Sequence, residues 1–337
     1  MQSLIIPPLC VVSEQAACDR LDNLAKVPHS LGVLETLAIR LAGMTGQARP
    51  LFPKKSVVLF AADHDITLNG LSATGQNVTT LQVRNFLKGG GTINAFTRNA
   101  GADLVVVDVG VKTDFSLDEC PNLIRRKVVH AAQDFSTGAA LTREEALACL
   151  QVGIDMARAE AAKGVSLLAA GEMGIGNTSP SSAIAAVTLG VSVENVTGVG
   201  SGITPEAVAR KIDLIKRGIA LNKPDPHDGV DMLAKVGGPE LGAMAGLMLG
   251  GASLRIPVVV DGFIAGAAAA LAVAIQPDVR NYLVGSHVSA EPGHQMLMRH
   301  LGIETYFDFG LRLGEGTGAA LFFPIIDASV RILHEMD

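Results

Sequence analysis

A glutamate between two glycines is the first residue in this sequence with an evident chemical use. Glu315 lies in the segment LRLGEGTGAA, where Gly314 and Gly316 give its carboxylate little local steric cover. A carboxylate held at a pocket wall could act as a general base, because partial burial raises a carboxyl pKa toward the working pH. The alternative is that Glu315 only complements the positive end of the helix that follows it.

A glycine-rich turn could bind an anion. The segment GEMGIGNTS places Gly176, Asn177 and Thr178 at the expected start of a helix, where backbone N–H groups can approach a phosphate. Glu172 in the same segment is the second candidate acid or base, after Glu315. A glycine turn that is merely capped by Asn or Thr would have the same pattern.

A second turn, VGSGITPEAVARK, has Gly202 ahead of a helix whose expected N-cap is Thr204. Lys211 lies further along this helix and could hold a phosphate as a point charge, although a solvated surface lysine is the alternative. The first turn has neither a P-loop lysine nor the GxGxxG spacing. The sequence therefore indicates neither an ATPase nor a dinucleotide-dependent enzyme.

Other polar residues follow apolar runs. His64 in AADHD and His287 in GSHVSAE could line a site, but hydrogen-bonded structural histidines are equally consistent with the pattern. Asp108 and Asp261 each end an apolar run and could cap the next turn or orient a ribose hydroxyl. Capping is the favoured interpretation for Asp108.

The segments that must position these residues alternate between strand and helix patterns, with one helix expected at 79–99. The expected strands are short runs at 56–62, 103–110, 165–170, 257–261 and 282–285. Apolar runs without strict alternation suit a parallel sheet with helices on both faces, and ligands bind such sheets at the carboxyl ends of the strands. Since polar or glycine-rich segments follow these runs, we expect five strand ends to face one site.

Domain organisation follows from length and periodicity. A chain of 337 residues can form one large domain with a satellite. The first fifty residues and the last helix have helical patterns, so we expect a small helical domain from 1–50 and 318–337. Residues 51–317 then form the large α/β catalytic domain.

Composition and charge exclude several classes of protein. Hydrophobic residues make up 48% of the chain and aromatic residues 4%, which is typical of a tightly packed α/β enzyme. The net charge of -6 disfavours nucleic acid and anionic membranes as partners. The four cysteines show no CxxC pair or metal-ligand spacing, so we expect no metal site. The N-terminus has no signal-peptide pattern, which predicts a cytoplasmic protein.

In combination and in order, these motifs resemble a known family. AADHDITLNGLSATGQNVT, DVGV, GEMGIGNTSP, KVGGPELGAMAGLMLG, VVVDGFIAGAAA, SHVSAEPGH and LRLGEGTGAAL are similar to nicotinate-nucleotide:dimethylbenzimidazole phosphoribosyltransferases over nearly the whole chain. The resemblance implies a Rossmann-like parallel sheet with a small helical domain from both termini. It also implies a cytoplasmic dimer that needs no metal or organic cofactor.

The resemblance further implies a reaction in cobalamin biosynthesis: phosphoribosyl transfer from nicotinate mononucleotide to a cobamide lower-ligand base such as 5,6-dimethylbenzimidazole. The products are the α-linked ribotide and nicotinate. Glu315 is then the base and Glu172 a secondary acid. The residues implied in substrate binding are Gly176, Asn177, Thr178, Gly202, Lys211, Ser72, Thr74, Gln76, Asp261, Ser289, Gly314 and Gly316.

The chain departs from the family pattern at residues 72–76, where many members resemble SAYPQ and this chain reads SATGQ. Because this stretch borders the base pocket in the family, phenol or p-cresol stays open as the acceptor; the relatives that use these acceptors are heterodimers. An NAD-dependent oxidoreductase is a remote alternative, since SVVLFAADHD carries no dinucleotide fingerprint. A non-catalytic partner subunit would be expected to lack Glu315.

Overall fold

The computed structural model describes residues 4–200 and 202–337, so Ser201 of the second glycine turn lies outside the described residues. Within them, all the strands are parallel and form one sheet in the order β3-β2-β1-β4-β5-β6. The strands are β1 (Lys55–Ala62), β2 (Ala102–Gly110), β3 (Ile124–Arg125), β4 (Leu167–Met173), β5 (Val258–Val260) and β6 (Leu283–Gly285). The order reverses between β1 and β4, which is where sheets of this type bind ligands.

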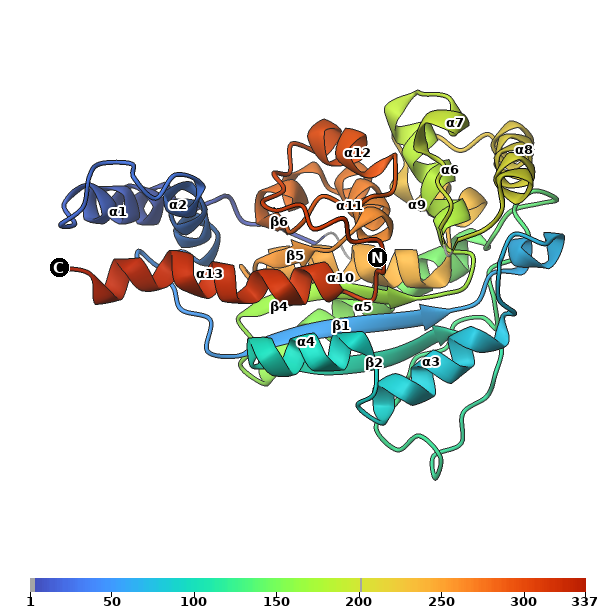
Figure 1. Cartoon of the computed structure of the whole chain (residues 1–337), viewed down its shortest axis with the longest axis horizontal. Helices are drawn as coiled ribbons and strands as arrows, with labels where there is room; N and C mark the ends of the chain where they lie inside the picture. The colour runs from blue at the N-terminus through green and yellow to red at the C-terminus, as the bar shows by residue number, and fades with distance from the viewer. Residues whose placement is uncertain (1–3, 201) are drawn as a thin grey trace.

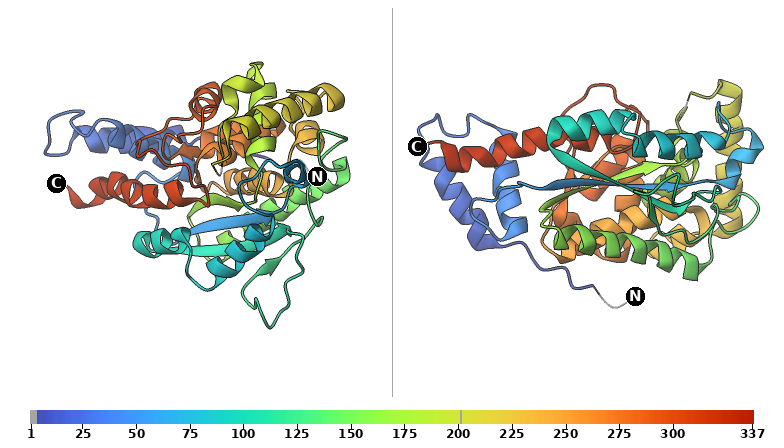
Figure 2. Two further views of the ribbon diagram at one scale, coloured as in Figure 1. Left: turned by 45° about the vertical axis from the view of Figure 1, so that its right-hand side comes forward. Right: turned by 90° about the horizontal axis from the view of Figure 1, so that it is seen from below.

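Helices cover both faces of the sheet, which confirms the expected fold class. One face carries α3 (Asn77–Leu87), α4 (Thr92–Ala100) and α13 (Thr317–Glu335), and the other carries α5 (Arg143–Ala162), α10 (Pro239–Ser253) and α11 (Phe263–Ile275) (Figure 2, right). Every residue of β1 and β4 is buried, as their continuous apolar sequences predict.

The remaining helices lie mostly above the carboxyl ends of the strands or at the far end of the molecule (Figure 1). They are α1 (Val11–Asp22), α2 (Val33–Thr45), α6 (Thr178–Leu189), α7 (Val193–Val196), α8 (Pro205–Asn222), α9 (Gly229–Val236) and α12 (His294–Leu301), with two short 3-10 helices at Asp65–Asn69 and Pro277–Tyr282.

One local expectation was wrong, and one strand was not predicted. The single helix expected at 79–99 is divided into α3 and α4, because three consecutive glycines at 89–91 interrupt the helix. Gly89 adopts a φ of 80° there. Strand β3 was not expected, since two residues at a sheet edge carry no detectable periodicity.

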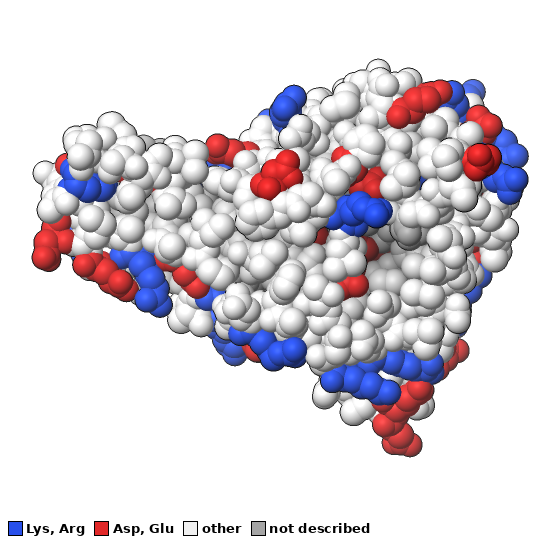
Figure 3. Space-filling model, viewed as in Figure 1, with Lys and Arg blue, Asp and Glu red and all other residues white. Residues whose placement is uncertain are grey.

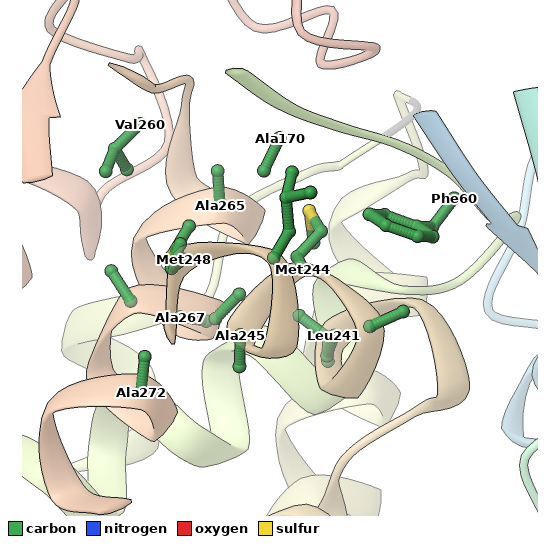
Figure 4. Close-up of a cluster of buried hydrophobic side chains, with 14 of the residues drawn as sticks. Phe60, Ala170, Leu241, Met244, Ala245, Met248, Val260, Ala265, Ala267 and Ala272 are labelled. Atoms are coloured by element: carbon green, nitrogen blue, oxygen red, sulfur yellow. The ribbon is translucent and has the colours of Figure 1, made fainter. Parts of the chain in front are cut away.

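Small residues let helices pack closely beneath the sheet. A Cβ at Gly246 of α10 would overlap the carbonyl of Leu150 in α5, so only glycine allows the two helices to approach this far. Figure 4 shows Met244 and Met248 of α10 directed toward the underside of the sheet, among alanines of α11. The Ala/Gly-rich composition thus provides close packing of short side chains.

The helices α1 and α2 pack with the C-terminal part of α13 at one end of the molecule (Figure 1, left). They enclose a small core of their own, made of Ala17, Leu21, Leu24, Ala38, Ala42 and Leu333. The N-terminal part of α13 instead contributes Phe322, Phe323 and Ile326 to the main core. One helix therefore belongs to both cores, and the expected domain boundaries stay a prediction.

Helix α13 is also long and apolar enough to cross a membrane by length and composition alone. However, 56% of the apolar window is buried inside the protein. Since α13 packs against α4, α2 and β4, its apolar residues are explained by the protein core.

Candidate active site

A cavity of about 580 Å³ lies at the carboxyl ends of β4, β5 and β6. Figure 3 shows a hollow on the corresponding face, with acidic and basic side chains at its edge. Ten of the residues expected in the site line this cavity: Glu315, Glu172, Gly176, Asn177, Thr178, Lys211, Thr74, Asp261, Ser289 and Gly314. The fold therefore brings together residues that lie far apart in the sequence.

The turn that carries Glu315 has an unusual backbone. Gly314, Glu315 and Gly316 all have positive φ angles, of 83°, 63° and 81°. For a residue with a side chain this conformation costs roughly 1–2 kcal/mol. Two neighbouring carboxyl groups hold it in place, because Glu315 donates its backbone N–H to Glu172 Oε1 (3.2 Å) and Gly316 donates its own to Asp261 Oδ2 (3.2 Å).

The carboxyl group of Glu315 is suited to accept a proton. The residue is 7% exposed, and its Oε2 has no hydrogen-bond partner among the described residues. Burial raises the pKa of Glu315 to about 7, with the negative charge of Asp261 adding to the effect and the backbone N–H of Ile93 opposing it. A base with a pKa near the working pH combines sufficient basicity with the correct protonation state.

Glu172 is a second buried carboxyl group beside Glu315. Burial raises the pKa of Glu172 to about 8, although hydrogen bonds from the Glu315 N–H and the Asn177 side chain act against this. The charges of Asp261 and Glu240 raise it further. Both adjacent carboxyl groups therefore have raised pKa values, and burial is the main cause in each.

The turn between β4 and α6 has the geometry of an anion site. Gly176 has a φ of 94°, and Asn177 directs its side-chain amide to Glu172 Oε2 instead of capping α6. The first backbone N–H groups of α6 consequently keep no side-chain cap and lie beside the cavity. Free N–H groups at a helix N-terminus favour a bound anion.

Lys211 of α8 completes this part of the cavity. It is only 2% exposed, so the alternative of a solvated surface lysine was wrong. Its Nζ donates to Thr178 Oγ1 (2.8 Å) and to the carbonyl of Gly198 (3.3 Å). Burial lowers the pKa of Lys211 to about 8, while the Glu291 carboxylate opposes that shift.

Four residues expected in the site do not line the cavity: Ser72, Gln76, Gly202 and Gly316. Gln76 donates instead to the carbonyl of His64 (2.7 Å) and to Thr67 Oγ1 (2.8 Å), which ties its loop to the end of β1. Ser72 Oγ accepts the N–H of Thr74 (3.2 Å). Both side chains therefore satisfy contacts within the protein.

The expectation that five strand ends face the cavity was also wrong. At the end of β1, His64 pairs with the buried Glu240 (2.8 Å), whose charge raises the pKa of His64 although burial acts to lower it. At the end of β2, Asp108 accepts the N–H of Val111 (2.9 Å) and caps the turn, as favoured from the sequence. His64 and Asp108 each have their own partner and do not line the cavity, whereas His287 does line it.

Other residues of the cavity were not singled out from the sequence. Glu291 accepts the backbone N–H of Gly200 (3.2 Å), and Arg312 donates to the Gly200 carbonyl (3.1 Å). The position of Arg312 three residues before Glu315 was the only local signal for it. Further lining residues also carried no signal in the sequence, including Leu71, Val78, Gln82, Phe263 and Leu311.

Among the residues that the structure describes, no group of three or more His, Cys, Asp or Glu is arranged to hold a metal ion. The described residues of the cavity include two buried carboxyl groups with raised pKa values, one buried lysine and a helix N-terminus without a side-chain cap. Such a set suits general-base catalysis on a substrate that carries a phosphate.

Comparisons with known proteins agree with this chemistry. A family model described as "Phosphoribosyltransferase" matches residues 6–337. A nicotinate-nucleotide–dimethylbenzimidazole phosphoribosyltransferase from Geobacter sp. (strain M21) is 50% identical over 317 residues, which cover 94% of this chain and 90% of the relative. Its counterpart from Desulforudis audaxviator is 46% identical over 331 residues, covering 98% and 93%.

A solved structure gives the same result for the fold. The crystal structure of the enzyme with this activity from Thermus thermophilus superimposes with a TM-score of 0.91 at 40% sequence identity. The match covers 97% of this chain and 96% of that one.

Proposed function

Because this chain belongs to the nicotinate-nucleotide–dimethylbenzimidazole phosphoribosyltransferase family, we propose that it transfers the phosphoribosyl group of nicotinate mononucleotide to a base such as 5,6-dimethylbenzimidazole. The family makes it an enzyme of the glycosyltransferase class. The observation that carries the proposal is the presence in one cavity of Glu315, with its raised pKa, and of an anion-binding turn beside Lys211.

The donor binds through its phosphate. Gly176, Asn177 and Thr178 of the turn line the cavity together with Lys211, whose Nζ donates to Thr178 Oγ1 (2.8 Å). A helix N-terminus and a buried lysine together favour a dianionic monoester. The raised pKa of Glu172 favours its neutral form, which limits the negative charge beside this anion, and this is the role we assign to that secondary acid.

The acceptor is deprotonated by Glu315. One ring nitrogen of the benzimidazole attacks C1′ with its lone pair, and Glu315 takes the proton from the other ring nitrogen as positive charge develops. The C1′–N bond to the pyridinium breaks, and its electron pair stays on the nicotinate nitrogen. Attack from the opposite face inverts C1′ and gives the α-linked ribotide.

One base is sufficient for this reaction. Nicotinate departs as a neutral pyridine ring, so its departure requires no general acid. The rest of the rate enhancement can come from holding the two substrates in line, which removes much of the entropic part of the barrier.

The assembly and location of the enzyme belong to the same proposal. We expect a cytoplasmic dimer, either of two copies or with a homologous chain. Exposed apolar side chains near the N-terminus, Ile5, Val11 and Val12, support the burial of this end against a partner.

An activity assay tests the proposal directly. Purified protein is incubated with nicotinate mononucleotide and one acceptor in each of four parallel reactions. The acceptors are 5,6-dimethylbenzimidazole, benzimidazole, adenine and phenol. Mass spectrometry is expected to detect nicotinate and the α-linked ribotide of dimethylbenzimidazole in equal amounts. Absence of nicotinate release with every acceptor would contradict the proposed function.

A further inference from the structure

Asp261 is directed at the protein backbone although it lies at the wall of the cavity. It follows β5 and is 3% exposed. Its Oδ2 accepts the N–H of Gly316 (3.2 Å), and its Oδ1 accepts the N–H of Ala319 (3.0 Å). Both N–H groups belong to the start of α13, where no partner exists within the helix. Gly316 has no side chain to cap α13, and Asp261 supplies this cap from another strand.

A second carboxyl group holds the preceding residue. Glu172, at the end of β4, accepts the N–H of Glu315 (3.2 Å). The backbone of Gly171 packs against the same turn so closely that a Cβ at this position would stand 2.7 Å from the Glu315 carbonyl oxygen. Neighbouring strands thus hold consecutive N–H groups of a turn with three successive positive φ angles.

His287 lies behind Asp261 and limits its movement. Its Nδ1 is 4.0 Å from Asp261 Oδ1 and 3.1 Å from Ser286 Oγ. The imidazole ring is stacked on His294 at 6.1 Å and lies beside Phe307 at 5.8 Å between centroids. The Asp261 carboxylate is consequently enclosed by backbone N–H groups on one side and an imidazole on the other.

We propose that Asp261 is a positioning residue, which fixes the backbone of the turn carrying Glu315 and leaves the ribose hydroxyls to other groups. This inference rests on the proposed role of Glu315 as the base. Both oxygens of Asp261 accept N–H groups at the start of α13, and backbone N–H groups of Gly262 and Gly318 also stabilise its charged form, so a ribose hydroxyl would have to compete with these donors. The sequence had suggested Asp261 as a substrate ligand, and the geometry points to a different role.

The charge of Asp261 also acts on the base. The carboxyl groups that face Glu315 are Asp261 and Glu172, and the Ile93 N–H opposes their effect on its pKa. His287 Nδ1 lies 4.0 Å from Asp261 Oδ1. Since a nearby negative charge disfavours ionisation, Asp261 raises the pKa of Glu315. Loss of this charge should make Glu315 a weaker base that is deprotonated at lower pH.

Kinetics of two variants separate positioning from substrate binding. Asp261→Asn keeps one acceptor oxygen and removes the charge, so kcat should fall by about tenfold and the acid limb of the kcat/KM profile should move to lower pH. Asp261→Ala removes both acceptors and should lower kcat by about 10²-fold. In both variants the KM for nicotinate mononucleotide should stay within about twofold of wild type, as expected when only transition-state geometry is lost.

The matched control is Asp278→Asn, an exposed aspartate in the short helix at Pro277–Tyr282 with the same chemical change. It should leave kcat, KM and the pH profile unchanged. If Asp261→Asn instead raised the KM for the donor by tenfold or more at unchanged kcat, Asp261 would be a ribose ligand and the proposal would be overturned. An unmoved acid limb in Asp261→Asn would also count against it.

Hydrogen exchange provides a readout that does not depend on the role of Glu315. Mass spectrometry of wild type and Asp261→Asn should show faster amide exchange in peptides covering 314–322, with unchanged exchange in β4. This result would stand even if Glu315→Gln proved fully active, in which case only the assignment of the base would fail. Unchanged exchange at 314–322 would refute the proposal that Asp261 holds the turn. If Asp261→Ala does not fold, the measurements on Asp261→Asn are sufficient for the test.

Discussion

The two walls of the cavity are built in different ways. We call residues 171–178, 261–262 and 310–316 the strand wall, and residues 71–82 the loop wall. In the strand wall the polar groups bind one another over long sequence distances, as in the bond from Glu315 to Glu172, 143 residues apart. In the loop wall Thr74 is exposed, and its N–H is bonded only two residues away, to Ser72.

This difference indicates that the two walls have different functions. The strand wall holds a strained turn and three buried carboxyl groups, so a change there disturbs several contacts at once. The loop wall is tied to the rest of the protein through Gln76 and through Thr79, whose Oγ1 accepts the N–H of Ile175 (3.2 Å), whereas Thr74 can vary without leaving a buried group unsatisfied. We therefore expect rate to depend on the strand wall and the choice of acceptor to depend on the loop wall.

The largest effect should come from Glu315 in the strand wall. Glu315→Gln keeps the size of the side chain and removes its basicity, so kcat should fall by about 10²–10⁴-fold. Donor binding, measured by calorimetry, should be nearly unchanged. Glu335→Gln, at the exposed end of α13, is the control with the same chemical change. Activity near that of wild type in Glu315→Gln would remove Glu315 from the role of base.

Lys211 should affect binding more than chemistry. Lys211→Ala removes a buried cation from the phosphate end of the cavity, so the KM for nicotinate mononucleotide should rise by about 10–100-fold with a smaller change in kcat. With nicotinate riboside, which lacks the phosphate, the effect should disappear. Lys216→Ala on the same helix, in an exposed ion pair with Glu194, serves as control. An equal loss with the riboside would show that Lys211 acts elsewhere.

The pH dependence of kcat/KM should be bell-shaped. Glu315 works when deprotonated, so activity should fall as pH drops below its pKa of about 7. Lys211 works when protonated, so activity should fall as pH rises above its pKa of about 8. Each limb should approach tenfold per pH unit. Lys211→Ala should flatten the basic limb, and a profile that stays level from about pH 5 to 9 would contradict both roles.

The smallest effect is expected in the loop wall. Thr74→Val keeps the shape of the side chain and removes a hydroxyl that could bond a phenol oxygen. Its kcat/KM with dimethylbenzimidazole should stay within about threefold of wild type, because no buried contact is lost. In competition at equal concentrations, the ratio of phenol to dimethylbenzimidazole product should fall. An unchanged ratio would mean that Thr74 does not contribute to the choice of acceptor. It would also count against the expectation that the loop wall determines this choice.

The sequence by itself determined the parallel sheet and the main candidates of the site. Continuous apolar runs with turn residues after them are local signals, and they predicted every described strand except β3 to within a few residues. Glu315, Glu172 and the 176–178 turn were found because glycine spacing marks unusual backbone. The motif order was sufficient to identify the family, which the comparisons confirm.

Only the tertiary structure decided which polar groups face the cavity. His64 and Asp108 follow strands just as Asp261 does, but His64 finds Glu240, 176 residues away, and Asp108 caps its own turn. The burial of Lys211 depends in the same way on contacts from other elements. A buried polar group must find a partner, and that partner is set by the packing of distant segments, which no local periodicity records.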